Sequence, residues 1–175
     1  MTKIIFDLNS KYTTPLTLIY LIDSGKVLML KRSPKKEMVA GEWLGLGGKL
    51  EPGEDLIDSA KREFVEETGL TIHDPVLRGT FTWMSASKYA GTLFIFTATK
   101  YEGDLLKKCD EGELAWQNID TLEKLKGLAA HQKLFLPKIL CNNSHFYCGI
   151  AAYDKDKLIR YTDNEQYFLE RKRIT

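Results

Sequence analysis

The stretch GKLEPGEDLIDSAKREFVEETGL, Gly48 to Leu70, decides how this chain is interpreted. From Asp55 to Thr68 it contains neither glycine nor proline. Its apolar residues there recur every four positions, as on one face of an α-helix: Leu56, Ala60 and Phe64. Gly69 follows, at the position where a left-handed residue commonly ends a helix. The stretch therefore predicts a glycine-containing loop that leads into an amphipathic helix.

Three carboxylates gather on one side of this predicted helix. At about 100° per residue, Glu63, Glu66 and Glu67 fall within an arc of about 100° beside the apolar stripe. Like charges at this spacing repel one another, so the arrangement favours a bound divalent cation. Oxygen ligands without histidine or cysteine suit Mg²⁺, with Mn²⁺ as a substitute, and substrate phosphates complete such sites. A solvated acidic helix face is the alternative interpretation.

The flanking residues fit a phosphate ligand. Gly47 and Gly48 allow main-chain groups to approach a ligand closely, and Lys49 can bind phosphate oxygens. Arg62 lies four residues before Glu66 and is expected to pair with it or with a neighbouring acid, which orients the carboxylates. A P-loop is excluded, because leucine rather than serine or threonine follows Lys49. The pattern thus combines a metal site with a phosphate site.

Residues 48–70 also match a longer pattern, G-x5-E-x7-R-E-U-x-E-E-x-G-U, in which U is a bulky apolar residue. Its specified positions are Gly48, Glu54, Arg62, Glu63, Phe64, Glu66, Glu67, Gly69 and Leu70. In this the chain resembles the Nudix hydrolases, whose Nudix box has this pattern. The resemblance implies an α/β protein, an α/β/α sandwich with a mixed β-sheet. It also implies Mg²⁺-dependent hydrolysis of a diphosphate linkage by water.

The same resemblance assigns roles within the box. The catalytic group that it implies is Arg62, Glu63, Glu66 and Glu67. The three glutamates hold the metal, and either Glu63 or Glu67 is the base for the attacking water. The carbonyl of Gly47 and the carboxylate of Glu111 are further metal ligands by this likeness, and the number of metal ions stays open. A solvated loop acid is the alternative interpretation of Glu111.

Features outside the box resemble the MutT-type branch of the family, which converts oxidised nucleoside triphosphates such as 8-oxo-dGTP to monophosphate and pyrophosphate. These features are GEWLGLGGK at 41–49 and Asp110-Glu111 shortly before Trp116. Leu44 and the segment 129–132 depart from the base-reading residues of the human-type enzymes, so the base stays open. The resemblance implies a small nucleotide substrate and a role in DNA repair.

Four residues are candidates for substrate contacts: Gly48, Lys49, Arg32 and Gln132. Arg32 belongs to a basic cluster with Lys31, Lys35 and Lys36, which either attracts a polyphosphate or is simply solvated. Gln132 and its neighbour His131 precede the last predicted helix and either contact a base edge or serve as ordinary helix-start residues.

Alternative functions keep part of this chemistry. A Nudix hydrolase of this composition can act instead on a nucleotide sugar, a dinucleoside polyphosphate, a pterin triphosphate or an RNA 5′ end. A non-catalytic nucleotide-binding module is a further alternative, but such modules usually lose box acids, and here Glu63, Glu66 and Glu67 are all present.

The composition limits the classes of protein to which this chain can belong. The 175 residues, 43% hydrophobic and 28% charged, predict a single globular domain over residues 1–175. A net charge of +1 predicts no stable nucleic-acid partner. Three cysteines without C-x-x-C spacing and an N-terminus without an apolar leader predict a cytoplasmic protein. The longest apolar run, Leu16 to Ile22, is too short to cross a membrane. The oligomeric state stays open.

Apolar runs and turn residues predict the remaining elements. Residues 16–22 and 27–30 flank a turn and form a hairpin, and a short strand begins at Trp43. Further strands are expected at 75–82, 92–100, 114–116, 146–153 and 157–161. The strand at 92–100 is continuously apolar in its middle and is expected at the centre of a sheet, and Cys148 is expected in the core. Helices are expected at 121–125 and 132–140, with Pro137 kinking the second.

Overall fold

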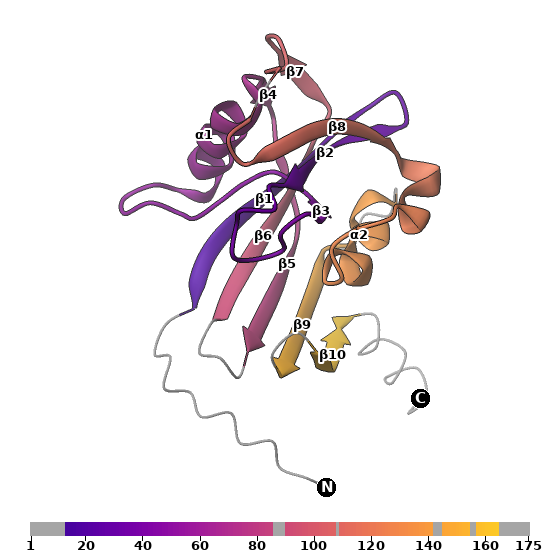
Figure 1. Ribbon diagram of the computed structural model, residues 1–175. Helices are drawn as coiled ribbons and strands as arrows, with labels where there is room; N and C mark the ends of the chain where they lie inside the picture. Colours follow the sequence, from indigo (N-terminus) through magenta and orange to yellow (C-terminus); the bar gives the residue numbers. More distant parts are fainter. Residues whose placement is uncertain (1–12, 86–89, 108, 142–144, 155–156, 165–175) are drawn as a thin grey trace, which may run out of the picture.

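The first two strands form the predicted hairpin. The computed structural model describes residues 13–85, 90–107, 109–141, 145–154 and 157–164 (Figure 1). In it, β1 (Thr14–Asp23) pairs antiparallel with β2 (Lys26–Arg32). The connecting residues Ser24 and Gly25 have φ of 49° and 74°, as a tight two-residue turn between right-twisted strands requires.

A mixed sheet is built around this hairpin. Its strand order is β10-β9-β5-β6-β1-β2-β3, with β8 also paired to β2. The other strands are β3 (Trp43–Leu44), β5 (Val76–Ser85), β6 (Ala90–Ala98), β8 (Gly112–Asn118), β9 (Tyr147–Asp154) and β10 (Lys157–Asp163). The β1–β6 and β5–β9 pairs are parallel and the others antiparallel. Since β6 lies between β5 and β1, its apolar run is central, as predicted.

The strongest helix prediction is also confirmed. Helix α1 (Leu56–Thr68) begins after Asp55, whose carboxylate accepts hydrogen bonds from the N–H groups of Ile57 and Asp58 at 2.8 and 2.9 Å. It ends at Gly69, where φ is 74°. Both ends of α1 are therefore determined by residues next to it in the sequence.

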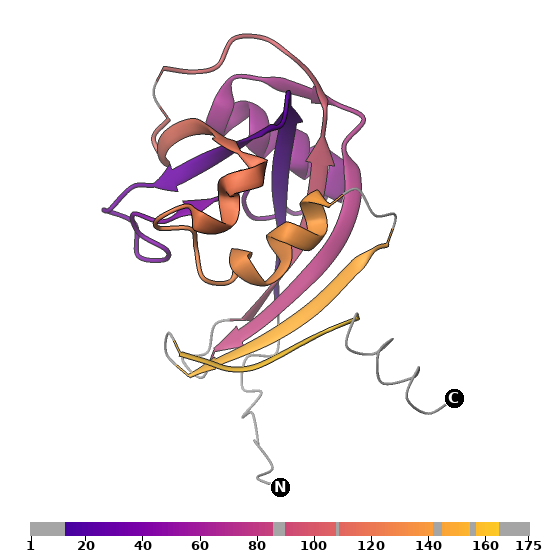
Figure 2. The same cartoon turned by 90° about the vertical axis from the view of Figure 1, so that its right-hand side faces the viewer.

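Helices cover both faces of the sheet. The buried residues Ala60 and Phe64 of α1 share one core with residues of β1 and β6: Ile19, Leu21, Phe96 and Ala98. On the other face, α2 (Gln132–Leu140) and the short 3₁₀ helix η1 (Ile119–Lys124) enclose a second core. Figure 2 shows α1 behind the sheet and these two helices in front of it. The chain thus has the expected α/β/α sandwich.

The structure corrects several details of the sequence analysis. A second small sheet pairs β4 (Thr71–His73) with β7 (Lys100–Glu102), and neither strand was expected, since each has only three residues. The prediction that Cys148 is buried is wrong, because the strand alternation turns Tyr147 toward α2 and Cys148 to the opposite, exposed face. No helix in the part of the chain that the structure describes is long and apolar enough to cross a membrane.

Candidate active site

The loop after β3 and the inner side of α1 meet at Glu67. The N–H of Gly47 donates a hydrogen bond of 2.8 Å to Oε2 of Glu67, and this glutamate is only 6% exposed. Burial raises the pKa of Glu67 to about 8. The Gly47 hydrogen bond opposes this shift, whereas the negative charges of Glu63 and Glu111 add to it. These carboxylates from α1 and from the loop before β8 therefore face a common region.

Two glycines give the loop its path past these acids. A Cβ atom on Gly48 would lie 2.4 Å from Oε1 of Glu63, so only glycine leaves room for that carboxylate. Gly47 has φ of 137°, and a Cβ there would lie 2.3 Å from the carbonyl oxygen of Thr17. Gly47 and Gly48 thus lie close to Thr17 and Glu63 of the protein itself, and the approach of a ligand to their main chain stays a prediction.

Arg62 ties the acids and the loop together. Its Nε and Nη2 donate to the two carboxylate oxygens of Glu54 at 2.8 and 3.0 Å, a bidentate contact. Its Nη1 lies 3.1 Å from Glu63 and 3.3 Å from Glu66, and Nη2 reaches the carbonyl of Lys49 at 3.3 Å. The guanidinium lowers the pKa of Glu54 to about 2. Arg62 thus orients three carboxylates at once.

Glu66 is a partner of Arg62, as the helical spacing predicted, whereas no role was predicted for Glu54. The signal for Glu54 was present, because it is a specified position of the matched pattern. The side chain of Glu66 is 58% exposed, so it is available to an incoming ligand. Lys49 is also exposed at the same edge of the loop.

Glu111 is held by the basic cluster that follows β2. Nζ of Lys36 lies 2.5 Å from Oε1 of Glu111, and Nη1 of Arg32 lies 3.4 Å from Oε2. The Nε of Arg32 is buried and has no hydrogen-bond partner among the described residues. The backbone joins the same segments, since the N–H of Ser33 donates to the carbonyl of Glu111 at 2.8 Å. The structure therefore brings Arg32 and Glu111 together, which sequence spacing did not predict.

Gln132 lies on the other face of the sheet, at the start of α2. Its side chain is fully buried, and Oε1 accepts a hydrogen bond of 2.8 Å from the hydroxyl of Tyr20, while Nε2 has no partner among the described residues. The neighbouring His131 ring lies 6.4 Å from that of Phe81, and burial lowers the pKa of His131 to about 4. A contact between Gln132 and a base thus requires this end of α2 to open.

Comparison with known proteins identifies the family. The family model of the NUDIX domain matches residues 13–139. The chain belongs to the Nudix family. It is 41% identical over 151 residues to the oxidized purine nucleoside triphosphate hydrolase of Mus musculus, covering 85% of this chain and 93% of the mouse protein. The mutator MutT protein of Bacillus halodurans has a similar structure, with a TM-score of 0.77 and 30% identity over 87% of this chain and 98% of that one.

Relatives of this Nudix hydrolase do not share one activity. This chain is 31% identical over 111 residues to the NAD-capped RNA hydrolase of Pseudomonas syringae. The aligned residues cover 62% of this chain and 38% of that protein. Hydrolysis is common to both named relatives, whereas the substrate differs.

The side chains of the box fit a hard divalent cation by their chemistry. Every candidate ligand is an oxygen: the carboxylates of Glu63, Glu66, Glu67 and Glu111 and the carbonyl of Gly47. Within the described residues, no three acidic, histidine or cysteine side chains already lie close enough together to hold an ion. Binding of an ion by these oxygens would therefore require their side chains to move closer together.

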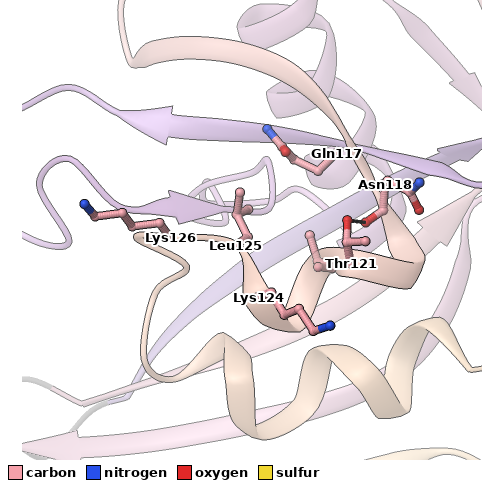
Figure 3. A pocket seen from close by; sticks show the side chains of 7 residues that line it. Gln117, Asn118, Thr121, Lys124, Leu125 and Lys126 are labelled. Carbon is pink, nitrogen blue, oxygen red and sulfur yellow. Dashed lines mark hydrogen bonds between the residues drawn. The ribbon is translucent and has the colours of Figure 1, made fainter.

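Two surface hollows lie away from the box. One, of about 260 Å³, is lined by residues 117–118, 121–122 and 124–126, and Figure 3 shows Lys124 and Lys126 pointing away from each other there. Binding of a phosphate would require cationic side chains that converge on one point, and the two lysines of this hollow do not converge. The other, of about 500 Å³, lies between η1 and α2. Neither hollow contains an acid of the Nudix box.

Proposed function

We propose that this Nudix hydrolase is a Mg²⁺-dependent pyrophosphohydrolase that cleaves an oxidised purine nucleoside triphosphate, such as 8-oxo-dGTP, to the monophosphate and pyrophosphate. The observation that carries the proposal is that the Gly47-Gly48 turn lies against two box acids, with the N–H of Gly47 donating to Glu67 and Gly48 packed against the carboxylate of Glu63. The mouse relative, similar over most of both chains, supports the choice of substrate. In a cell, this activity removes damaged DNA precursors, a cytoplasmic contribution to DNA repair.

The metal ligands in this proposal are Glu63, Glu66, Glu67, Glu111 and the carbonyl of Gly47. When bound, the ion stabilises negative charge on the phosphoryl oxygens and lowers the pKa of water. Arg62 positions the box acids through the contacts described above. Glu63 or Glu67 is the proposed acceptor of the proton of the attacking water.

The phosphates of the substrate lie along the loop and the basic cluster. The exposed Lys49 supplies positive charge to the phosphates, and the guanidinium of Arg32 is the second proposed contact. Gly48 is the proposed contact in the loop, where the lack of a side chain leaves Glu63 in place. Gln132 is the proposed contact to the base.

The proposed site is tested by Glu66→Gln and Glu67→Gln, each of which removes a charged oxygen while keeping the side-chain size. We expect each variant to lose at least about 100-fold in kcat, because a metal ligand or the base is lost. Pyrophosphate and phosphate release is measured with Mg²⁺ across normal and oxidised triphosphates. Glu123→Gln, on η1 and exposed, is the control and keeps wild-type turnover. Full activity in both box variants would disprove the site.

A second candidate substrate is an NAD-capped RNA end, favoured by the Pseudomonas syringae relative. The chain matches only 38% of that protein, and its net charge of +1 lacks the positive field of an RNA-binding surface. An NAD-capped RNA oligonucleotide added to this panel distinguishes the two, because cap hydrolysis releases nicotinamide mononucleotide and no pyrophosphate.

A further inference from the structure

Two cationic side chains contact the carboxylate of Glu111, one at each of its oxygens. The ammonium of Lys36 lies 2.5 Å from Oε1, and the guanidinium of Arg32 lies 3.4 Å from Oε2. The side chains of Lys36 and Glu111 are about equally exposed, at 35% and 32%, so water has access to the pair. An ion pair of this kind contributes little to stability and can be exchanged for another partner.

The backbone places Lys36 at this point. The N–H of Lys36 donates to the carbonyl of Ser33 at 3.1 Å, and Ser33 in turn donates to the carbonyl of Glu111 at 2.8 Å. Gly112, which follows Glu111, also packs closely against β2, because a Cβ on it would lie 2.0 Å from the carbonyl oxygen of Lys31. The loop after β2 and the loop before β8 thus hold the ammonium and the carboxylate together.

This contact conflicts with metal binding by Glu111. The ammonium at 2.5 Å occupies one of the two lone pairs of Oε1, and its positive charge repels an approaching cation. We propose that Lys36 is an internal counter-ion of Glu111 that the divalent cation displaces, which frees the ammonium to bind the polyphosphate of the substrate. The inference rests on the proposed function, because it takes Glu111 to be a metal ligand.

Removal of the lysine charge therefore strengthens metal binding. Mn²⁺ is titrated into the full-length protein without nucleotide, and free Mn²⁺ is measured by electron paramagnetic resonance. Lys36→Met, which keeps the aliphatic chain, is expected to bind Mn²⁺ about threefold to fivefold more tightly than wild type. Lys36→Arg keeps the charge and retains wild-type affinity.

A matched control separates the specific contact from the general loss of positive charge. Lys35→Met removes the same charge one residue away, from a side chain that is exposed. Its gain in affinity should be less than half that of Lys36→Met. An equal gain in the two variants would overturn the proposal, as would unchanged or weaker binding by Lys36→Met.

A double variant tests whether the effect passes through Glu111. In a Glu111→Gln background, Lys36→Met should give no further gain in Mn²⁺ affinity. A gain in affinity that persists in this background also overturns the inference. Thermal melting checks that each variant is folded, and Lys36→Gln replaces Lys36→Met if the latter is not. Mn²⁺ binding that Glu67→Gln leaves unchanged would instead contradict the proposed metal site, whatever Lys36 does.

Discussion

At the scale of single residues, Glu67 shows how the fold changes the chemistry of a side chain. The same carboxyl on an exposed helix face would have a pKa near its usual value of about 4.3. Beneath Gly47 it is almost fully buried, and its pKa rises to about 8. In the absence of a cation, Glu67 is therefore largely protonated at neutral pH. A bound dication would reverse this balance by favouring the charged form.

This raised pKa predicts a pH-dependent stability of the metal-free protein. The folded state holds a proton on Glu67 that the unfolded state has lost above pH 4.5, so stability falls as pH rises from about 4.5 to about 8. Glu67→Gln has no carboxyl group to titrate at this position, so the variant does not lose stability over this pH range. With EDTA present, we expect the variant to melt at least about 3 °C above wild type at pH 8, with the difference disappearing near pH 5. Melting by circular dichroism measures it. A difference independent of pH would contradict the prediction.

At the scale of elements, α1 carries the box acids at positions that its two ends define. Asp55 begins the helix and Gly69 ends it, so Arg62, Glu63 and Glu67 face the loop at 47–49. The predicted bounds were correct because caps act within about one turn of the residues that supply them.

Removal of the N-cap should weaken this helix without changing its chemistry. Asp55→Ala deletes two hydrogen bonds to the first turn and is expected to cost about 1 kcal/mol of the free energy of unfolding, measured by urea denaturation. Asp55→Asn keeps an acceptor oxygen and should cost about half as much or less. Equal stability of Asp55→Ala and wild type would show that packing of Phe64 alone determines where α1 begins.

At the scale of the whole molecule, the β9–β10 hairpin extends the sheet beyond the residues matched by the family model. It is attached to α2 by a buried polar group, in which Asp163 contacts Lys138 and accepts a hydrogen bond from the hydroxyl of Tyr161. The Tyr161 hydroxyl oxygen also lies 3.1 Å from the carbonyl oxygen of Leu134. This group holds β10 against α2, the helix that begins at Gln132.

Asp163→Asn should therefore destabilise the whole fold. In this variant Lys138 contacts a side chain at position 163 that is only 1% exposed and no longer carries a negative charge. We expect a loss of about 2 kcal/mol in the free energy of unfolding, measured by urea denaturation, since one partner of a buried pair is removed. Asp154→Asn, at the exposed end of β9, is the control and should change stability by less than about 0.5 kcal/mol. Equal effects of the two variants would exclude this attachment.

The sequence by itself determined the features that depend on near neighbours. The β1–β2 hairpin, the bounds of α1, the central position of β6 and the ridge of glutamates all follow from spacing and turn residues within a few positions. The family pattern at 48–70 also belongs here, because it is a local arrangement of side chains.

Only the tertiary structure decided which distant groups meet. Arg62 takes Glu54 as its main partner, Lys36 holds Glu111 across 75 positions of sequence, and Gln132 turns to Tyr20 inside the second core. These contacts depend on which distant loops lie side by side and on how α1 and α2 pack on the sheet, which a local periodic pattern does not encode. The burial that raises the pKa of Glu67 arises in the same way, since the Gly47 loop that covers it lies 20 positions away in the chain.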